Sequence, residues 1–169
     1  MTAVQIASIL LVLVACVPDV RTRRIPNELT FGAALLAFAF HVVTGGWHGL
    51  LASAGGWVLG AALFFPFFAL RGMGAGDVKL IAAVGAWLGP AMVFWVAIFT
   101  SLSGGVIGLA VALAHGYART ALMNVFALIG FWRSVGLRPL PRVSLEGSGP
   151  RLAYAIPIAI GTMVTLWLK

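Results

Sequence analysis

The chain has 169 residues, of which 62% are hydrophobic and only 9% are charged, and it carries a formal net charge of +7. An ordinary soluble domain has a charged fraction near 25%, so this composition excludes that class and predicts a polytopic membrane protein. The single cysteine excludes a disulfide framework and a cysteine-rich zinc module, and we expect no metal and no cofactor.

Apolar runs in chain order predict an all-α membrane helix bundle in a single domain, residues 1–169. A helix needs about 20 residues to cross the hydrocarbon of a bilayer, so a short run must be shielded by its neighbours or by thinned lipid. The short run here is the fourth, which Gly89 and Pro90 close. The six predicted spans are residues 3–18, 29–44, 50–70, 78–88, 91–114 and 152–168.

The stretch 117–135 could be read as a seventh span. Its apolar residues Leu122, Val125 and Phe126 share one helical face, while Asn124 lies elsewhere. This pattern favours an amphipathic helix lying along the membrane interface. The segment that follows it, 136–150, is rich in Pro, Gly and Ser and is predicted to be a polar loop.

The basic residues orient the predicted bundle. With six spans, the connections after spans one, three and five share one side of the membrane and hold ten of the eleven basic residues. These are Arg21, Arg23, Arg24, Arg71, Lys79, Arg119, Arg133, Arg138, Arg142 and Arg151. The positive-inside rule then places the N-terminus outside and these connections in the cytoplasm, so nucleic acid is not needed to explain the charge.

The four acidic residues can be judged individually. Asp19 ends the first predicted span and Asp77 begins the fourth, so both fall at the cytoplasmic membrane edge. Two neighbouring carboxylates cannot readily ionise together, which suits them to general acid and base chemistry. Glu28 is expected in the first turn of a helix capped by Asn27, and Glu146 in the polar loop.

Each aspartate also has a structural explanation. Asp77 could stabilise a helix start, with Lys79 or Arg71 neutralising its charge. Asp19 could be an interfacial charge beside Arg21, Arg23 and Arg24, which are explained by lipid or topology at least as well as by substrate. The three glycines at 72, 74 and 76 favour a site at Asp77, because missing side chains let another backbone approach closely.

Two segments carry a resemblance to a known family. They are Asp19-Val20-Arg21-Thr22-Arg23-Arg24-Ile25-Pro26-Asn27 and Gly72-Met73-Gly74-Ala75-Gly76-Asp77-Val78-Lys79-Leu80. Together they resemble the prepilin peptidases, membrane aspartic peptidases with a GxGD motif, here Gly74, Gly76 and Asp77. The late segment 152–157 is similar to the pattern of the family's last span.

The resemblance implies a function for the chain. Asp19 and Asp77 would be the catalytic pair of an aspartic endopeptidase in the bacterial inner membrane, with Gly74, Gly76 and Lys79 supporting the site or substrate access. The substrate would be a prepilin or pseudopilin, which has a basic leader and a hydrophobic helix, cut at the cytoplasmic face. The lone Cys16 precludes the cysteine cluster of the bifunctional members, so methyltransferase activity is not expected, and the chain resembles the short type of tight-adherence (Flp) pilus systems.

Two alternatives belong to other classes. A proton- or ion-coupled transporter using Asp77 would place carboxylates near mid-membrane among internal repeats, and neither is evident in the sequence. An intramembrane serine peptidase could use Ser103 and His115, but a hydroxyl in a membrane helix more often bonds the helix's own backbone. His41 and His48 are expected at the interface, where solvation explains them.

Overall fold

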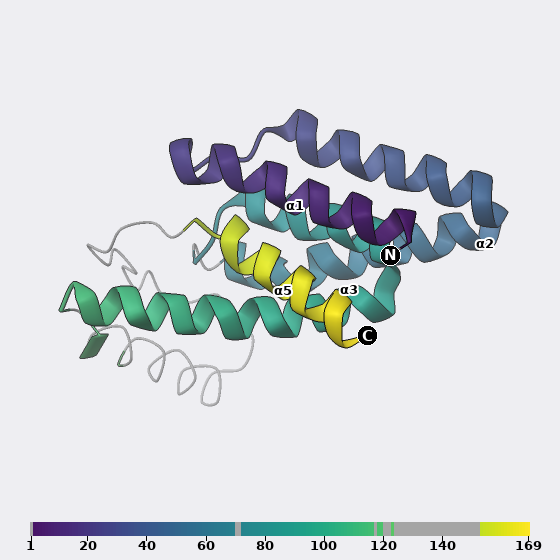
Figure 1. Cartoon of the computed structure of the whole chain (residues 1–169). Helices are drawn as coiled ribbons and strands as arrows, with labels where there is room; N and C mark the ends of the chain where they lie inside the picture. The colour runs from purple at the N-terminus through teal and green to yellow at the C-terminus, as the bar shows by residue number, and fades with distance from the viewer. Residues whose placement is uncertain (1, 70–71, 117, 120–122, 124–152) are drawn as a thin grey trace. The chain divides into compact units, whose positions relative to one another are not determined.

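The computed structural model describes residues 2–69, 72–116, 118–119, 123 and 153–169. Its helices are α1 (Ala3–Thr22), α2 (Asn27–Ala69), α3 (Ala75–Ala114) and α5 (Ala155–Leu168). Of these, α1, α2 and α3 are long and apolar enough to cross a membrane, and α5 is a shorter apolar helix. The described residues therefore form an all-helical membrane-type bundle (Figure 1).

The two longest helices are each divided by a glycine. Gly46 has φ 56° and ψ −142°, and Gly89 has φ 77° and ψ 174°, conformations that glycine adopts without a steric penalty. A Cβ added at Gly49 would contact the carbonyl oxygen of His41, although eight residues of continuous helix would hold them about 12 Å apart. The chain therefore reverses at Gly46, and α2 is a helical hairpin.

The same reversal occurs in α3. A Cβ added at Gly85 would lie 3.1 Å from a methyl carbon of Val93, on the far side of Gly89. The helical segments on either side of the two kinks contain the predicted spans 29–44, 50–70, 78–88 and 91–114. The number of these segments that cross the membrane stays a prediction, as does the outside position of the N-terminus.

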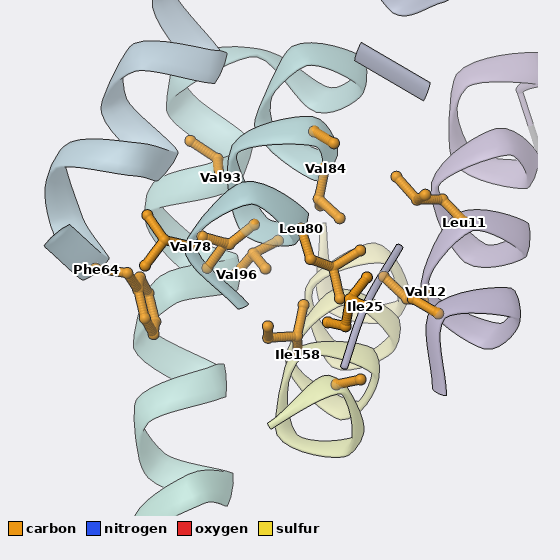
Figure 2. Packing of buried hydrophobic residues seen from close by; sticks show 14 of the residues in the cluster. Leu11, Val12, Ile25, Phe64, Val78, Leu80, Val84, Val93, Val96 and Ile158 are labelled. Carbon is orange, nitrogen blue, oxygen red and sulfur yellow. The ribbon is translucent and has the colours of Figure 1, made fainter. Parts of the chain in front are cut away.

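The first segment of α3 lies at the centre of the bundle. Residues 77–78 and 80–86 are all buried, and Leu80, Ile81 and Val84 are completely inaccessible. Figure 2 shows this cluster, with Phe64 of α2 at one end and Leu11 and Val12 of α1 at the other. Of the two expectations for the short fourth run, shielding by neighbours or by thinned lipid, this burial agrees with the first.

Small residues allow the central segment to be enclosed. Gly56 of α2 and Gly85 of α3 come from two different GxxxG patterns and face each other so closely that a Cβ on either would contact the carbonyl oxygen of the other. One turn along, a Cβ on Gly60 would lie 2.8 Å from the carbonyl oxygen of Ile81. Ser53 adds a hydrogen bond of 2.6 Å from its hydroxyl to the carbonyl oxygen of Ala86. Close backbone approach of this kind is the usual result of GxxxG in membrane helices.

Helix α5 completes the unit by packing beside α1, which the purple and yellow ribbons of Figure 1 show. It also meets the second segment of α3, because Gly161 abuts Thr100 and Gly104 lies within van der Waals distance of Pro157. Pro157 is in the first turn of α5, where a missing N–H breaks no helical hydrogen bond. The outer face of α1 exposes Leu10, Val14 and Val17, as a lipid-facing surface would.

The chain divides into two compact units, Met1–Gly104 with Leu152–Lys169, and Gly105–Arg151. The first contains the packing described above. In the second, α3 ends at Ala114 and is followed by Gly116 at φ 73°. The predicted interfacial helix 117–135 and the predicted loop 136–150 fall outside the described residues, except for residues 118–119 and 123.

Candidate active site

Asp19 lies in the last turn of α1 and is buried, with 4% of its surface exposed. Its carboxylate oxygen Oδ2 accepts a hydrogen bond of 3.0 Å from the backbone N–H of Ala155. Ala155 is the first residue of α5, whose own cap residue, Tyr154, supplies no side-chain hydrogen bond. Asp19 therefore caps a helix that begins 136 residues later, where a carboxylate also meets the positive end of the helix dipole.

The backbone after Asp19 turns sharply. Arg23 takes the left-handed conformation at φ 55°, and its N–H donates to the carbonyl oxygen of Asp19 at 2.9 Å. This cap ends α1 and directs the chain into Ile25, which is buried. The side chains of Arg21, Arg23 and Arg24 are exposed, a placement equally compatible with lipid, topology and substrate roles.

Asp77 lies in the first turn of α3 and is 7% exposed. Its Oδ2 accepts a hydrogen bond of 2.9 Å from the N–H of Gly74, and its own N–H donates to the carbonyl oxygen of Gly74 at 3.2 Å. The side chain thus satisfies a backbone donor at the start of its own helix. Both aspartates are therefore held by an N–H at a helix start, Asp77 within its helix and Asp19 across the bundle.

The two carboxylates come together although they lie in separate parts of the sequence. Asp19 and Asp77 are close enough for their charges to repel each other, and Tyr154 also lies within electrostatic range of Asp77. Like charges at short range in a buried site cannot both be ionised without cost. The end of α1 and the start of α3 thus lie within electrostatic range of each other.

The two glycines at positions 74 and 76 of the second motif have different neighbours. A Cβ on Gly76 would lie 3.3 Å from the Cβ of Ile25, so Gly76 lets the first motif pack against the second. A Cβ on Gly74 would lie 3.2 Å from Oδ2 of Asp77, the oxygen that its N–H binds. Gly74 therefore keeps space free directly beside the carboxylate.

Lys79 has a contact that neither sequence-based alternative included. Its ammonium group donates to Oδ1 of Asn27 at 2.9 Å and lies 5.3 Å from the centre of the Phe31 ring. Asn27, predicted as a cap, is the first residue of α2 and offers its side-chain oxygen to Lys79 instead. Lys79 therefore ties the second motif to the first.

We expect a double-mutant cycle to measure the coupling between Lys79 and Asn27. Lys79→Met and Asn27→Ala should each reduce turnover a few-fold, and the double variant should be little worse than either, with a coupling energy of about 0.5–1 kcal/mol for a partly exposed polar pair. Rates of substrate cleavage in matched membrane vesicles provide the measurement. Additive losses would show that the two side chains act independently.

Tyr154 and Ala155 were not among the predicted site residues. Tyr154 is partly buried, precedes α5 directly, and places one ring carbon 3.7 Å from a Cβ built on Gly104. The only signal for them was the late segment 152–157, which resembled a family pattern without assigning either residue a role. Their contribution depends on a contact with Asp19 or Asp77 that no local pattern encodes.

The other polar residues considered in the sequence do not contact either aspartate in the hydrogen bonds described below. The hydroxyl of Ser103 donates to the carbonyl oxygens of Thr100 and Pro157 at 3.1 and 3.2 Å, which agrees with the expectation that it bonds backbone. A nitrogen of the His41 ring lies 2.9 Å from the carbonyl oxygen of Ala37. Glu28 is exposed in the first turn of α2, as predicted.

Fold and site together define a helical membrane protein with two buried, mutually repelling carboxylates at helix ends. The sequence profile of the type IV leader peptidase family matches residues 6–109, which include both aspartates. The chain belongs to this family.

Similar curated proteins are longer than this chain. Two prepilin leader peptidase/N-methyltransferases of Aeromonas salmonicida, one of them from strain A449, are each 29% identical to it over 88% of its length. The chain spans 46% of those relatives. No solved structure matches.

Proposed function

We propose that the protein is an intramembrane aspartic endopeptidase that removes leader peptides from prepilins or pseudopilins, with Asp19 and Asp77 as its catalytic pair. The observation that carries the proposal is the meeting of two buried carboxylates from α1 and α3. Membership of the type IV leader peptidase family supports the substrate class. Both aspartates lie at helix ends, whereas an ion-coupled transporter would place its carboxylates near the middle of the membrane.

The chemistry follows from a pair that shares one proton. The ionised carboxylate accepts a proton from a water molecule, whose oxygen attacks the carbonyl carbon of the peptide bond, while the neutral carboxyl donates its proton to the carbonyl oxygen. In the resulting tetrahedral intermediate, the proton gained from water passes to the amide nitrogen. The carbon–nitrogen bond then breaks and releases an amine and a carboxylic acid. The pair returns to its starting protonation when the second carboxylate takes up the proton of the new carbonyl group.

The proposed orientation places this chemistry at the cytoplasmic face of the bacterial inner membrane. Six spans with the N-terminus outside would put ten of the eleven basic residues on the cytoplasmic side. The same topology puts the end of α1 and the start of α3 on that side. A substrate with a basic leader followed by a membrane helix would present its junction at this depth.

Two narrower features belong to the proposal. The absence of methyltransferase activity is supported by the lone Cys16, because the cysteine cluster of the bifunctional members cannot be formed by the residues of this chain. A role in processing the prepilins of a tight-adherence pilus system is supported by the chain's resemblance to the short members of the family. Both can be tested in the assay that tests the peptidase activity.

The test is a cleavage assay with a candidate prepilin encoded in the same genome. Protein and prepilin are placed together in vesicles, and the N-terminus of the shortened product is determined. We expect one cut between the leader and the hydrophobic helix, with no methyl group on the new N-terminus when S-adenosylmethionine is supplied. An intact substrate under conditions that preserve the folded protein would refute the activity.

A further inference from the structure

An open apolar pocket lies in the same compact unit as the two aspartates. It has a volume of about 410 Å³, within the range of specific ligand pockets, and is lined by the second segments of α2 and α3. The lining residues used below are Phe64, Phe67, Phe94, Ser101 and Leu102. None of the described residues that line it is charged, so the pocket does not suit a basic leader peptide.

The packing of the glycines fixes the level of the pocket on the side of α2. Gly56 faces Gly85 and Gly60 faces Ile81, so these two segments run antiparallel. One further turn in the same register brings Phe64 to the level of Asp77. The α2 wall of the pocket therefore includes the depth of the candidate catalytic carboxylate.

The α3 wall of the pocket also includes the depth of Asp77. Gly85 approaches Val93 on the second segment of α3, which runs antiparallel to the first. About two turns further along that segment, Ser101 reaches the level of Asp77. Phe94 lies about 10 Å deeper, at a rise of about 1.5 Å per residue. The pocket thus extends from the level of Asp77 into the apolar part of the bundle.

A short connection links the pocket to the motif that holds Asp77. The carbonyl oxygen of Phe67 accepts a hydrogen bond of 2.9 Å from the N–H of Gly72. Two residues later, the N–H of Gly74 donates to Asp77. One wall of the pocket is therefore continuous, through hydrogen-bonded backbone, with the loop that sets the carboxylate.

The pocket opens on the outer surface of the bundle. Phe67, Phe94 and Leu102 are 52%, 45% and 60% exposed. In a membrane, this surface would be reached by a segment that moves sideways through lipid. Because lipid is as apolar as the pocket, shape and van der Waals contact would decide what binds there.

We propose that this pocket binds the first apolar side chains of the substrate's membrane helix, those that directly follow the cut bond. The proposal rests on the peptidase function proposed above. Its basis is that the pocket includes the level of Asp77, extends from there into the apolar zone, and has no charged side chain among its described lining residues.

Ser101 offers a direct test by filling the pocket. Ser101→Phe places a ring at the level of Asp77 and should raise KM for the prepilin about tenfold or more, with a smaller change in kcat. Ala52→Phe adds a ring at an exposed site of α2 outside the pocket lining and should leave KM unchanged.

A crosslinking experiment identifies the occupant. A photoreactive phenylalanine analogue at position 101, in the full chain carrying Asp77→Asn to keep the prepilin uncut, should crosslink to the apolar segment after the cleavage site. The same analogue at position 52 should not. Crosslinks to lipid only, or an unchanged KM in Ser101→Phe, would overturn the pocket assignment. Failure of the peptidase function would show differently, as no cleavage by the wild type.

Discussion

Asp77→Asn is expected to lower the rate of leader cleavage by at least about a hundredfold, the lower range for loss of a general acid or base. Asparagine has the shape of aspartate, and its carbonyl oxygen can still accept the hydrogen bond from Gly74. The variant should therefore insert and accumulate like the wild type. Comparing cleavage rates at equal protein levels separates loss of chemistry from loss of structure.

Asp19→Asn should have an effect of the same size for the same reason, since its amide oxygen can still cap Ala155. The double variant should be no slower than either single variant, because the two groups act as one unit. Glu28→Gln is the matched control, a neutralised acid in the first turn of α2 that is exposed. It should cleave normally, and normal cleavage by either aspartate variant would remove that residue from the catalytic pair.

Gly56→Ala is expected to disrupt the packing of the bundle. The added methyl group would contact the carbonyl oxygen and carbon of Gly85, which are backbone atoms and cannot rotate away. Overpacking commonly costs about 1–3 kcal/mol, and we expect the upper end or more here. Thermal unfolding in detergent should show a clearly lower midpoint, and cleavage should fall with the fraction of folded protein.

The neighbouring glycine provides the control. A Cβ on Gly55 has Pro90 Cγ as its nearest contact, at 4.0 Å, which is ordinary van der Waals distance. Gly55→Ala should leave the unfolding midpoint within a degree or two of the wild type, or slightly raise it through better helix propensity, as a change of a few tenths of a kcal/mol would. Equal destabilisation by the two substitutions would mean that the Gly56–Gly85 contact does not control packing.

Much of the fold could be predicted because it depends on local composition. Apolar runs located the helices, and the break at residues 45–49 and the Gly89-Pro90 pair separated segments that the structure joins across kinks. The short run ending at Gly89 had to be shielded because it is too short to span a bilayer alone, and it forms the centre of the bundle. The positions of Asp19 and Asp77 at helix ends follow from the same reading.

The missed features depend on contacts between distant residues. The sequence left an interfacial charge beside three arginines as an alternative role for Asp19, but the side chain is buried against the start of α5. Nothing near position 19 encodes its hydrogen bond with the N–H of Ala155. In the same way, the pairing of Lys79 with Asn27 arises only after α2 and α3 have packed.

The bond from Asp19 to Ala155 has a consequence for the order in which the protein matures. A nascent chain that has reached the end of α3 already contains both aspartates, but it lacks the backbone N–H that positions one of them. The candidate site is complete only when α5 has been synthesised and has inserted beside α1. Under the proposed function, peptidase competence would have to wait for α5, which would keep a partly synthesised chain from cutting neighbouring membrane proteins.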